Sequence, residues 1–285
     1  MGSSPALAAA LRAVRCPVCA EPLAQDGQQL RCERGHGFDI ARQGYVNLAV
    51  GGPPPANADS PAMVAARERF LGRGYYARIA AALARLAASL VPGCGERGLV
   101  LDLAGGTGYY LAAVLDALPG RVGVTLDLSK PALRRAAGAH SRALALGADV
   151  WQRIPLADGS AAIVTSVFGP RNPTETIRVL AADGAFLLVT PTAAHLAEVI
   201  GPLGMLSIDA AKASRLAASM ARLDLVVSEP LSYQVRLTHT DLADLVSMGP
   251  SAHHVDPARL AHRIGPMPEP LPVTVSVNLA AYRRT

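Results

Sequence analysis

The chain has 285 residues, 51% of them hydrophobic, which is enough for one large domain with a sizeable core and smaller appendages. It has no run of about 18 uncharged apolar residues, so we expect a cytoplasmic protein with no membrane partner. The net charge is +5, and all of the 27 basic residues except Lys130 and Lys212 are arginine, a bias that modestly favours a nucleic-acid partner.

Three of the four cysteines lie near the N-terminus, in the stretch CPVCAEPLAQDGQQLRCERGH. Cys16 and Cys19 form a C-x-x-C pair, and after twelve residues Cys32 and His36 form a C-x-x-x-H pair. Two turns that each carry two sulfur or nitrogen ligands are typical of a tetrahedral structural zinc site. Because four protein ligands close such a site, we expect this zinc to stabilise the fold and to take no part in chemistry.

Two other uses of clustered cysteines fit the sequence less well. A redox-active C-x-x-C would open a helix, whereas Pro17, Pro22 and the following AQDGQQ predict the turns of a small β-rich knuckle. A disulfide framework is not expected, because no secretory signal precedes the cluster. The fourth cysteine, Cys94, lies far away in VPGCGERG, and we interpret it as a loop thiol.

Changes in composition divide the chain into three parts. The segment FDIARQGYVNLAV predicts two short strands. The next segment, GGPPPANADSPA, is rich in proline, glycine and small residues, and it predicts a linker. We therefore expect a zinc-binding domain at residues 1–50, a linker at residues 51–62 and a main domain at residues 63–285.

Two helical segments, MVAARERFL and YYARIAAALARLAASLV, follow the linker. Between residues 51 and 90, five arginines are balanced by only two acids, Asp59 and Glu68. We interpret this surplus of positive charge as a solvated helix face, with a phosphate-contact patch as the alternative.

From Gly98 onward, short apolar runs alternate with helical segments, which is typical of a parallel sheet flanked by helices. Near the end, LDLVVSEPLSYQVRL and PVTVSVNLAAYR predict two long strands that pair antiparallel at one sheet edge. A helical insert between them holds His253 and His254. The other predicted strands are LVLDLA, RVGVTLD, RALALGAD, AAIVTSVF and AFLLVT, and the predicted helices are YYLAAVLDAL, KPALRRAAGA and PTETIRVL.

A glycine-rich loop joins the first of these strands to its helix. Gly105, Gly106 and Gly108 stand where the backbone must turn sharply and approach a ligand closely. Asp102, at the end of the strand, could orient this loop or bind an amino group of the ligand. Asp127 closes the next strand, nineteen residues after Gly108, where a carboxylate can accept both hydroxyl groups of an adenosine ribose. Strand, loop, helix, strand and acid in this order predict a nucleotide-type site.

The sequence favours S-adenosylmethionine over a dinucleotide as the ligand of this site. The dinucleotide motif G-x-G-x-x-G, read from Gly106, requires glycine at position 111, where the chain has Leu111. S-adenosylmethionine has no phosphates, and no arginine cluster is dedicated to a pyrophosphate. After the third strand, Asp149 can accept from the adenine amino group, with Val150 and Trp151 against the ring. A strand-end cap is the alternative role for Asp149.

Several stretches besides the zinc cluster carry a family resemblance: FDIARQGYVNL, ADSPAMVAARERFLGRGYY, LDLAGGTGYYL, LDLSKPALRRAA, VFGPRNPTETIRVL and MGPSAHHVDPARLAHRI. They follow one another as in the bacterial 23S rRNA guanine-N1 methyltransferases. The chain most closely resembles the branch that contains the tylosin- and mycinamicin-resistance methyltransferases of actinobacteria. The likeness spans roughly residues 15–283 of the chain.

This resemblance implies an α/β fold, a class I (Rossmann-like) S-adenosylmethionine-dependent methyltransferase domain with an N-terminal zinc-binding domain that helps to hold RNA. It implies methylation of N1 of a guanine in hairpin 35 of 23S rRNA, of the guanine(748)-N(1) type. Macrolide resistance and housekeeping modification both stay open as its role, and so does a homodimer. The implied zinc ligands are Cys16, Cys19, Cys32 and His36, and the implied cofactor-binding residues are Asp102, Gly105, Gly106, Gly108 and Asp127.

The acceptor side of the site is less defined by the sequence. Guanine N1 carries a proton that something must accept, and the target base must be unpaired or flipped out. In this fold VFGPRNP lines the acceptor side, so Arg171 and Asn172 are candidates to bind the O6 and N1 edge. His253 and His254 are candidates for the base that accepts this proton, but they are more simply interpreted as surface or packing residues. Two alternative functions stay open, a small-molecule methyltransferase and a non-catalytic zinc-dependent RNA-binding protein.

Overall fold

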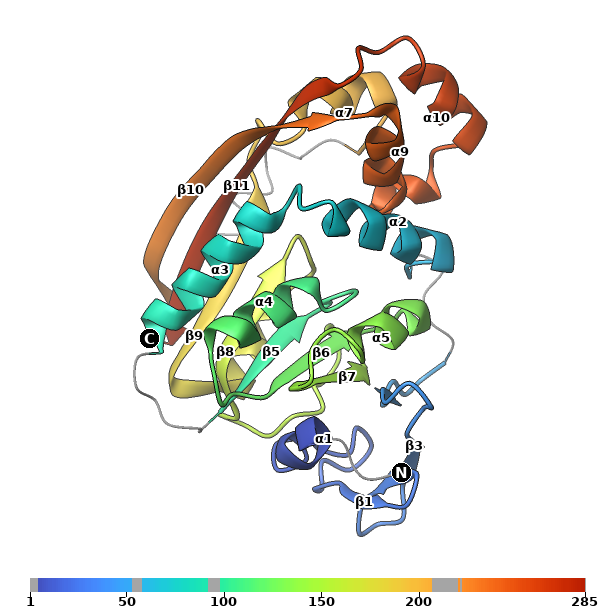
Figure 1. The fold of residues 1–285 in the computed structure, drawn as a ribbon. Helices are drawn as coiled ribbons and strands as arrows, with labels where there is room; N and C mark the ends of the chain where they lie inside the picture. The colour runs from blue at the N-terminus through green and yellow to red at the C-terminus, as the bar shows by residue number, and fades with distance from the viewer. Residues whose placement is uncertain (1–4, 53–57, 92–97, 207–219, 221, 285) are drawn as a thin grey trace.

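An eight-stranded sheet runs through the centre of the molecule, in the strand order β10-β11-β9-β8-β5-β6-β7-β4 (Figure 1).

Cys94 and the middle of the expected linker lie outside the part of the chain that the structure describes. Within the described part, no helix is long and apolar enough to cross a membrane. The structure, a computed structural model, describes residues 5–52, 58–91, 98–206, 220 and 222–284.

The strands from β9 to β4 in this order are parallel to one another. β5 and β7 are buried along their whole length, as expected for parallel strands that are covered on both faces. The chain places β6 and β7 on one side of β5 and then β8 and β9 on the other, so a topological switch point lies at the carboxyl end of β5. The bounds are β4 (Val46–Asn47), β5 (Leu99–Leu103), β6 (Gly123–Asp127), β7 (Ala143–Gly147), β8 (Ala161–Val167) and β9 (Leu180–Pro191).

A long antiparallel hairpin, formed by β10 (Leu223–Leu237) and β11 (Leu271–Arg284), completes the other edge of the sheet. β11 pairs antiparallel with β9, and β10 is the outermost strand. The antiparallel pairing expected from the sequence is therefore confirmed. The insert between the two strands is helical as expected and comprises α9 (His239–Ser247), the 3-10 helix η1 (Pro250–His253) and α10 (Pro257–Ile264).

Helices cover both faces of the sheet, and two hydrophobic cores result. Val100 of β5 lies in one core with α3 (Ala77–Leu90) and α4 (Tyr109–Ala117). Its neighbour Leu101 faces the other core, which contains α1 (Pro5–Ala10) and α6 (Pro173–Val179). Other described helices are α2 (Pro61–Gly72), α5 (Lys130–Ala136) and α7 (Ala197–Leu203). The sequence did not predict α1 or α7.

The N-terminal segment is docked against the sheet. Its own three-stranded sheet consists of β1 (Ala24–Asp26), β2 (Gln29–Arg31) and β3 (Gly37–Asp39), and β4 then joins the main sheet beside β7. Val14 forms an antiparallel bridge with Leu156. Leu30 of β2 and Leu101 of β5 belong to the same hydrophobic core. The zinc-ligand segment therefore helps to cover one face of the main sheet.

The α2 helix begins at Pro61, two residues inside the expected linker. The side chain of Ser60 accepts a hydrogen bond from the backbone N–H of Met63, so the Ser-Pro pair caps the helix. Arg69 of α2 and its C-cap residue Arg73 bond to Asp244 of α9, at 2.6 and 2.8 Å. These arginines hold α2 against α9, a role that neither interpretation of the arginine-rich segment included.

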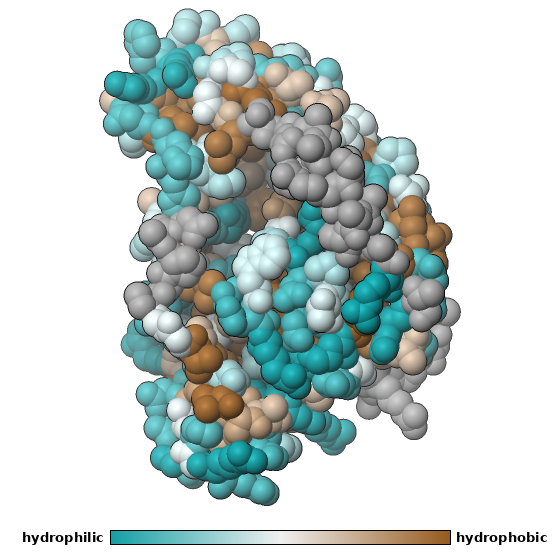
Figure 2. Space-filling view, turned by 180° about the vertical axis from the view of Figure 1, so that it is seen from behind, coloured by the Kyte–Doolittle hydropathy of each residue, from teal (hydrophilic) through white to brown (hydrophobic). Residues whose placement is uncertain are grey.

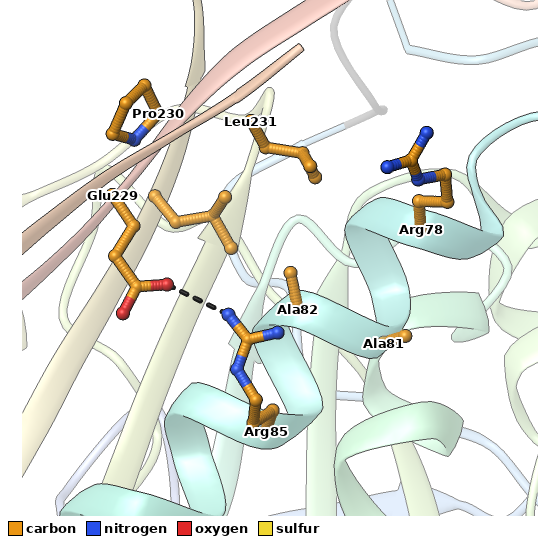
Figure 3. A pocket seen from close by; sticks show the side chains of 8 residues that line it. Arg78, Ala81, Ala82, Arg85, Glu229, Pro230 and Leu231 are labelled. Carbon is orange, nitrogen blue, oxygen red and sulfur yellow. Dashed lines mark hydrogen bonds and ion pairs between the residues drawn. The ribbon is translucent and has the colours of Figure 1, made fainter. Parts of the chain in front are cut away.

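The arginines of α3 also have partners within the protein. The guanidinium of Arg78 lies 4.5 Å from the centre of the Tyr233 ring. Arg85 pairs with Glu229 of β10 at 2.9 Å (Figure 3). Arg78 and Arg85 line a hollow of about 280 Å³ between α3 and the hairpin. The arginines of this region therefore tie α3 to the antiparallel edge of the sheet and α2 to the insert of the hairpin.

Candidate functional site

The four residues expected to bind zinc come together at one end of the molecule. Cys16 and Cys19 lie on one turn, and Cys32 and His36 lie on a second turn. The second turn contains Gly35 in the left-handed conformation, at a φ of 85°, which favours glycine. The four ligand atoms all lie within 4.8 Å of one another. The expected juxtaposition of these residues is therefore confirmed.

The distances between these ligand atoms fit a tetrahedral zinc ion. Cys19 Sγ lies 3.6 Å from Cys32 Sγ, and His36 Nδ1 lies 3.6 Å from Cys16 Sγ and 3.3 Å from Cys32 Sγ. A tetrahedron with Zn–S bonds of about 2.3 Å and a Zn–N bond of about 2.0 Å separates its ligand atoms by about 3.5–3.8 Å. Burial opposes ionisation of Cys32, but hydrogen bonds with His36 lower the pKa of its thiol to about 6, which favours the thiolate that zinc requires.

A second candidate site is a cavity of about 660 Å³ at the carboxyl ends of the parallel strands. The loops after β5, β6, β7, β8 and β9 form its walls, and residues of α2 and the end of α9 form its roof. This is the crevice where ligands bind in open α/β sheets. The space-filling view shows the surface hollowed between the top of the molecule and its middle (Figure 2). Ala58 is the first described residue along the chain that lines the cavity.

The glycine loop forms part of the cavity wall, as the sequence predicts. A Cβ built on Gly105 would lie 2.1 Å from Oδ2 of Asp102, so a side chain has no room there. Gly106 adopts a φ of 59°, which puts it in the left-handed region. Gly108 stands immediately before α4. The loop can therefore bring its backbone close to a ligand.

Asp102 is buried beneath this loop, with only 1% of its surface exposed. One of its carboxylate oxygens accepts a hydrogen bond from the Thr165 hydroxyl at 2.7 Å, and the other has no partner among the described residues. Burial raises the pKa of Asp102 to about 7, the Asp127 charge adds to the increase, and the Thr165 bond opposes it. Asp102 also lines the cavity, so both roles expected for it remain available.

Asp127 ties the glycine loop to β6. Its Oδ2 accepts from the backbone N–H of Gly106 at 2.9 Å, and its Oδ1 accepts from that of Ser129 at 2.8 Å. Burial raises the pKa of Asp127, and the two backbone hydrogen bonds oppose this increase. A carboxylate has about four lone-pair sites, so these two bonds leave capacity to accept from ligand hydroxyl groups.

The residues after β7 line the cavity beside Asp127. Oδ1 of Asp149 accepts from the backbone N–H of Trp151 at 2.9 Å, so Asp149 does stabilise the local turn. It also lines the cavity, as do Val150 and Trp151. Val150 is buried, whereas Trp151 is 62% exposed. Capping the turn and contacting a ligand are therefore compatible roles for Asp149.

An aromatic group forms the opposite part of the wall. His195 Nδ1 accepts from the backbone N–H of Ser276 at 3.1 Å, which leaves Nε2–H to donate to the Tyr76 hydroxyl at 3.3 Å. The ring of Phe168 stacks on that of His195, with 5.5 Å between their centres. Phe168 is 39% exposed and has a φ of 55°, which is uncommon for an aromatic residue. Burial lowers the pKa of His195 to about 4, so the imidazole is neutral at physiological pH.

The two acceptor-side candidates lie next to the cavity, and neither lines it. Asn172 caps α6, because its side chain accepts from the backbone N–H of Glu175 at 3.3 Å. Burial lowers the pKa of Arg171. His253 and His254 are exposed and also stand apart from the cavity lining. A direct role of Arg171 or Asn172 in base binding therefore stays a prediction.

Sequence reasoning missed Arg67, Tyr76, Phe168 and His195, all of which line the cavity. Phe168 is the last residue of the predicted strand AAIVTSVF, and that position at a strand end was a usable signal. Tyr76 and His195 are 119 residues apart, and no local motif links them.

Comparisons with known proteins identify relatives of this chain. Residues 14–49 match the model of the RlmA N-terminal zinc-ribbon family. Over 95% of its length the chain is 50% identical to a protein of Micromonospora griseorubida, provisionally named as a 23S rRNA (guanine-N(1)-)-methyltransferase, and it covers 97% of that protein. Over 96% of its length it is 46% identical to the 23S rRNA (guanine(748)-N(1))-methyltransferase of Streptomyces fradiae, of which it covers 97%. Among solved structures, a methyltransferase of Thiobacillus denitrificans with bound S-adenosyl-L-homocysteine is 16% identical at a TM-score of 0.46, covering 71% of this chain and 90% of that chain.

The strand order, the final antiparallel hairpin and the glycine loop with acids at the strand ends define a class I methyltransferase domain, here preceded by a zinc ribbon. The chain belongs to the family of bacterial 23S rRNA (guanine-N1)-methyltransferases. Its cofactors are S-adenosylmethionine, which methyltransferases of this class use as methyl donor, and zinc, which the ligand set fits.

Proposed function

We propose that this protein uses S-adenosylmethionine to methylate N1 of one guanine in hairpin 35 of 23S rRNA. The observation that carries the proposal is the 46% identity, over nearly the whole of both chains, to a relative named for methylation of guanine 748 at N1. The cavity supports it, because the acids at the strand ends and a partly exposed aromatic ring line one continuous space. A methyl group at this position would protect the ribosome against macrolides that bind nearby.

The acids and the glycine loop suit the adenosine half of the cofactor. S-adenosylmethionine supplies a methyl group that its sulfonium makes electrophilic. In this proposal, Asp127 accepts from the ribose hydroxyl groups and Asp149 accepts from the adenine amino group. Val150 packs on the adenine ring, and the backbone at Gly105 and Gly106 lies against the ligand. These roles use the polar atoms that already line the cavity.

The aromatic group suits a flat purine as the acceptor. Phe168 offers a partly exposed ring face, and Tyr76 and His195 support it from behind. Both nitrogens of His195 are engaged and its pKa is about 4, so we assign it to positioning the aromatic rings and not to accepting the N1 proton. Alignment of the acceptor is the main task of the protein, because the donor is already activated.

We propose that residues 1–50 form a zinc-binding domain that grips the RNA, that residues 51–62 link it to the main domain, and that residues 63–285 carry out the transfer. Hairpin loops expose unpaired bases, which suits a reaction on the Watson–Crick edge of guanine. Arginine contacts to phosphate would make binding weaken with added salt.

We further propose a cytoplasmic location and a homodimer, and light scattering of the purified protein tests the latter.

Methyl transfer to a defined RNA tests the proposed function. A transcript of the 23S rRNA region that contains hairpin 35 is incubated with enzyme and methyl-labelled S-adenosylmethionine, digested to nucleosides and separated. We expect label in 1-methylguanosine. A matched transcript with adenine in place of the target guanine should take up no label. Label in a different nucleoside, or none in either transcript, would overturn the proposal.

A further inference from the structure

The cofactor of the proposed function carries an α-carboxylate as well as two cationic groups, the α-ammonium and the sulfonium. The cavity is lined by Asp59, Asp102, Asp127 and Asp149, which suit the cations. They do not suit the carboxylate, because an anion taken out of water needs a cationic or hydrogen-bonding partner. Among the described residues that line the cavity, Arg67 is the only lysine or arginine.

Arg67 extends from α2 to the glycine loop. A Cβ built on Gly106 would lie 2.9 Å from Nη1 of Arg67, so the guanidinium lies against the backbone of this loop. The backbone N–H of Gly106 donates to Asp127, the residue proposed to hold the ribose. The guanidinium, the loop and the ribose-binding acid are therefore neighbours along one wall of the cavity.

Two contacts hold the guanidinium in this position. Its Nη1 forms an ion pair with Asp59, and its Nη2 donates to the backbone oxygen of Met248 at 2.6 Å. Asp59 is itself fixed, because its backbone oxygen accepts from the Ser129 hydroxyl at 2.7 Å. The side chains of Arg67 and Asp59 are only 23% and 20% exposed. A guanidinium has five N–H donors, so these two contacts leave donors for a ligand.

We propose that Arg67 binds the α-carboxylate of S-adenosylmethionine, and that Asp59 is the positioning residue that orients its guanidinium. The inference rests on the proposed function and adds the residue that recognises the amino-acid end of the cofactor. Arginine suits this role, because its planar fork can donate two parallel hydrogen bonds to a carboxylate. The roof helix α2 thereby takes a direct part in cofactor binding.

Calorimetric titration with two cofactors tests this assignment. The probes are S-adenosylmethionine and decarboxylated S-adenosylmethionine, which lacks the carboxylate and retains the amine, the sulfonium and the adenosine. Wild-type protein should bind the intact cofactor on the order of 10- to 100-fold more tightly, the range for hydrogen bonds to a charged group. Arg67→Ala should lose most of this preference and bind the decarboxylated cofactor about as well as wild type does. Arg67→Lys should retain part of the preference.

The matched control is Arg69→Ala, because Arg69 lies on the same helix, bonds to Asp244 and does not line the cavity. This variant should keep the preference for the intact cofactor. Equal affinity of wild type for the two cofactors would overturn the proposal. So would an equal loss of affinity for both cofactors in Arg67→Ala, because Arg67 would then have only a structural role. Where Arg67→Ala fails to fold, the wild-type comparison still tests whether the site recognises the carboxylate, and the partial loss of preference in Arg67→Lys tests Arg67 itself. Wild-type protein that binds neither cofactor would instead refute the proposed function itself.

Discussion

Asp102 shows how the fold adjusts a single carboxyl group for its site. Burial raises its pKa to about 7, far above the ordinary value of 3.8. In the free protein, the raised pKa means that Asp102 makes its full contribution to the free energy of unfolding below the ordinary pKa of 3.8. This contribution is lost as the pH rises from there through about 7. A bound cation has the opposite effect, because it favours the ionised carboxylate. Cofactor binding and ionisation of Asp102 should therefore support each other.

The first prediction follows from this coupling. The affinity of wild-type protein for S-adenosylmethionine should increase as the pH rises from 6 to 8, because a larger fraction of Asp102 is then ionised. Asp102→Asn has no charge to lose, so its affinity should depend less on pH over the same range. Calorimetry at several pH values measures both slopes. Parallel curves for the two proteins would show that Asp102 does not contribute to the pH dependence.

The second prediction concerns Asp127. Asp127→Ala should weaken cofactor binding by about 1.5–3 kcal/mol, the range for hydrogen bonds to a charged group. The loss includes the bond that fixes the N–H of Gly106. Asp116→Ala is the matched control, because its side chain is 75% exposed and lies outside the cavity lining. Unchanged affinity in Asp127→Ala would refute the assignment to the ribose.

The cavity-lining residues that the sequence predicted are those whose place follows from their position in one element. These residues are the glycines, Asp102, Asp127 and Asp149. They lie at or just beyond the carboxyl ends of the parallel strands, where ligands bind in open α/β sheets. Arg67 and His195 reach the cavity from a roof helix and from the loop after β9. Their roles depend on how distant segments pack, so no local spacing could predict them.

At the scale of elements, the contact between α2 and α9 roofs the cavity. Asp244 of α9 is only 6% exposed and accepts from both Arg69 and Arg73 of α2. Two residues before Arg69, Arg67 donates to the backbone oxygen of Met248, just after α9. The α2 helix and the insert of the terminal hairpin are thus joined above the cavity.

The third prediction tests this junction. Asp244→Ala should lower the free energy of unfolding by about 1–3 kcal/mol, because two guanidinium groups lose a buried acceptor. It should also weaken cofactor binding, since α2 would lose its support. Arg85→Ala is the control, because Arg85 is 68% exposed and an exposed ion pair contributes about 0–1 kcal/mol. Denaturant unfolding measures both variants, and an equal effect would contradict the account.

Alternating apolar and helical segments were sufficient to predict the main sheet and its antiparallel edge. They were not sufficient for α7, which contains Pro202 and is preceded by Leu196 in the left-handed conformation, at a φ of 58°. A proline inside the segment weakens the sequence pattern of a helix. A left-handed leucine before the helix is a feature of the structure that the sequence does not announce. β4 has only two residues, and its place beside β7 depends on tertiary packing.

At the scale of the whole molecule, the zinc ribbon and the methyltransferase sheet are coupled through one core. Leu23 and Leu30 pack in the same cluster as Leu101 and Leu103 of β5. The described residues that line the cavity nevertheless begin only at Ala58. The ribbon should therefore influence the stability of the main domain and the binding of RNA more than the binding of the cofactor.

The fourth prediction separates these effects. Structural zinc can contribute about 10–16 kcal/mol to a small domain, so Cys32→Ser should unfold the ribbon. The variant should melt at a lower temperature, because part of the shared core becomes exposed, and it should still bind S-adenosylmethionine while methyl transfer to RNA is lost. Calorimetry and transfer assays on one preparation test this. Retained zinc and retained RNA methylation in Cys32→Ser would contradict the metal assignment.

The most direct test of the proposed function is primer extension on 23S rRNA that has been incubated with enzyme and S-adenosylmethionine. A methyl group on N1 blocks Watson–Crick pairing, so reverse transcriptase should stop at one guanine in the loop of hairpin 35. The stop should be absent without the cofactor and strongly reduced with Asp127→Ala. Methyl label that enters the RNA without a new stop in hairpin 35 would contradict the account, because the enzyme would then modify another atom or another site.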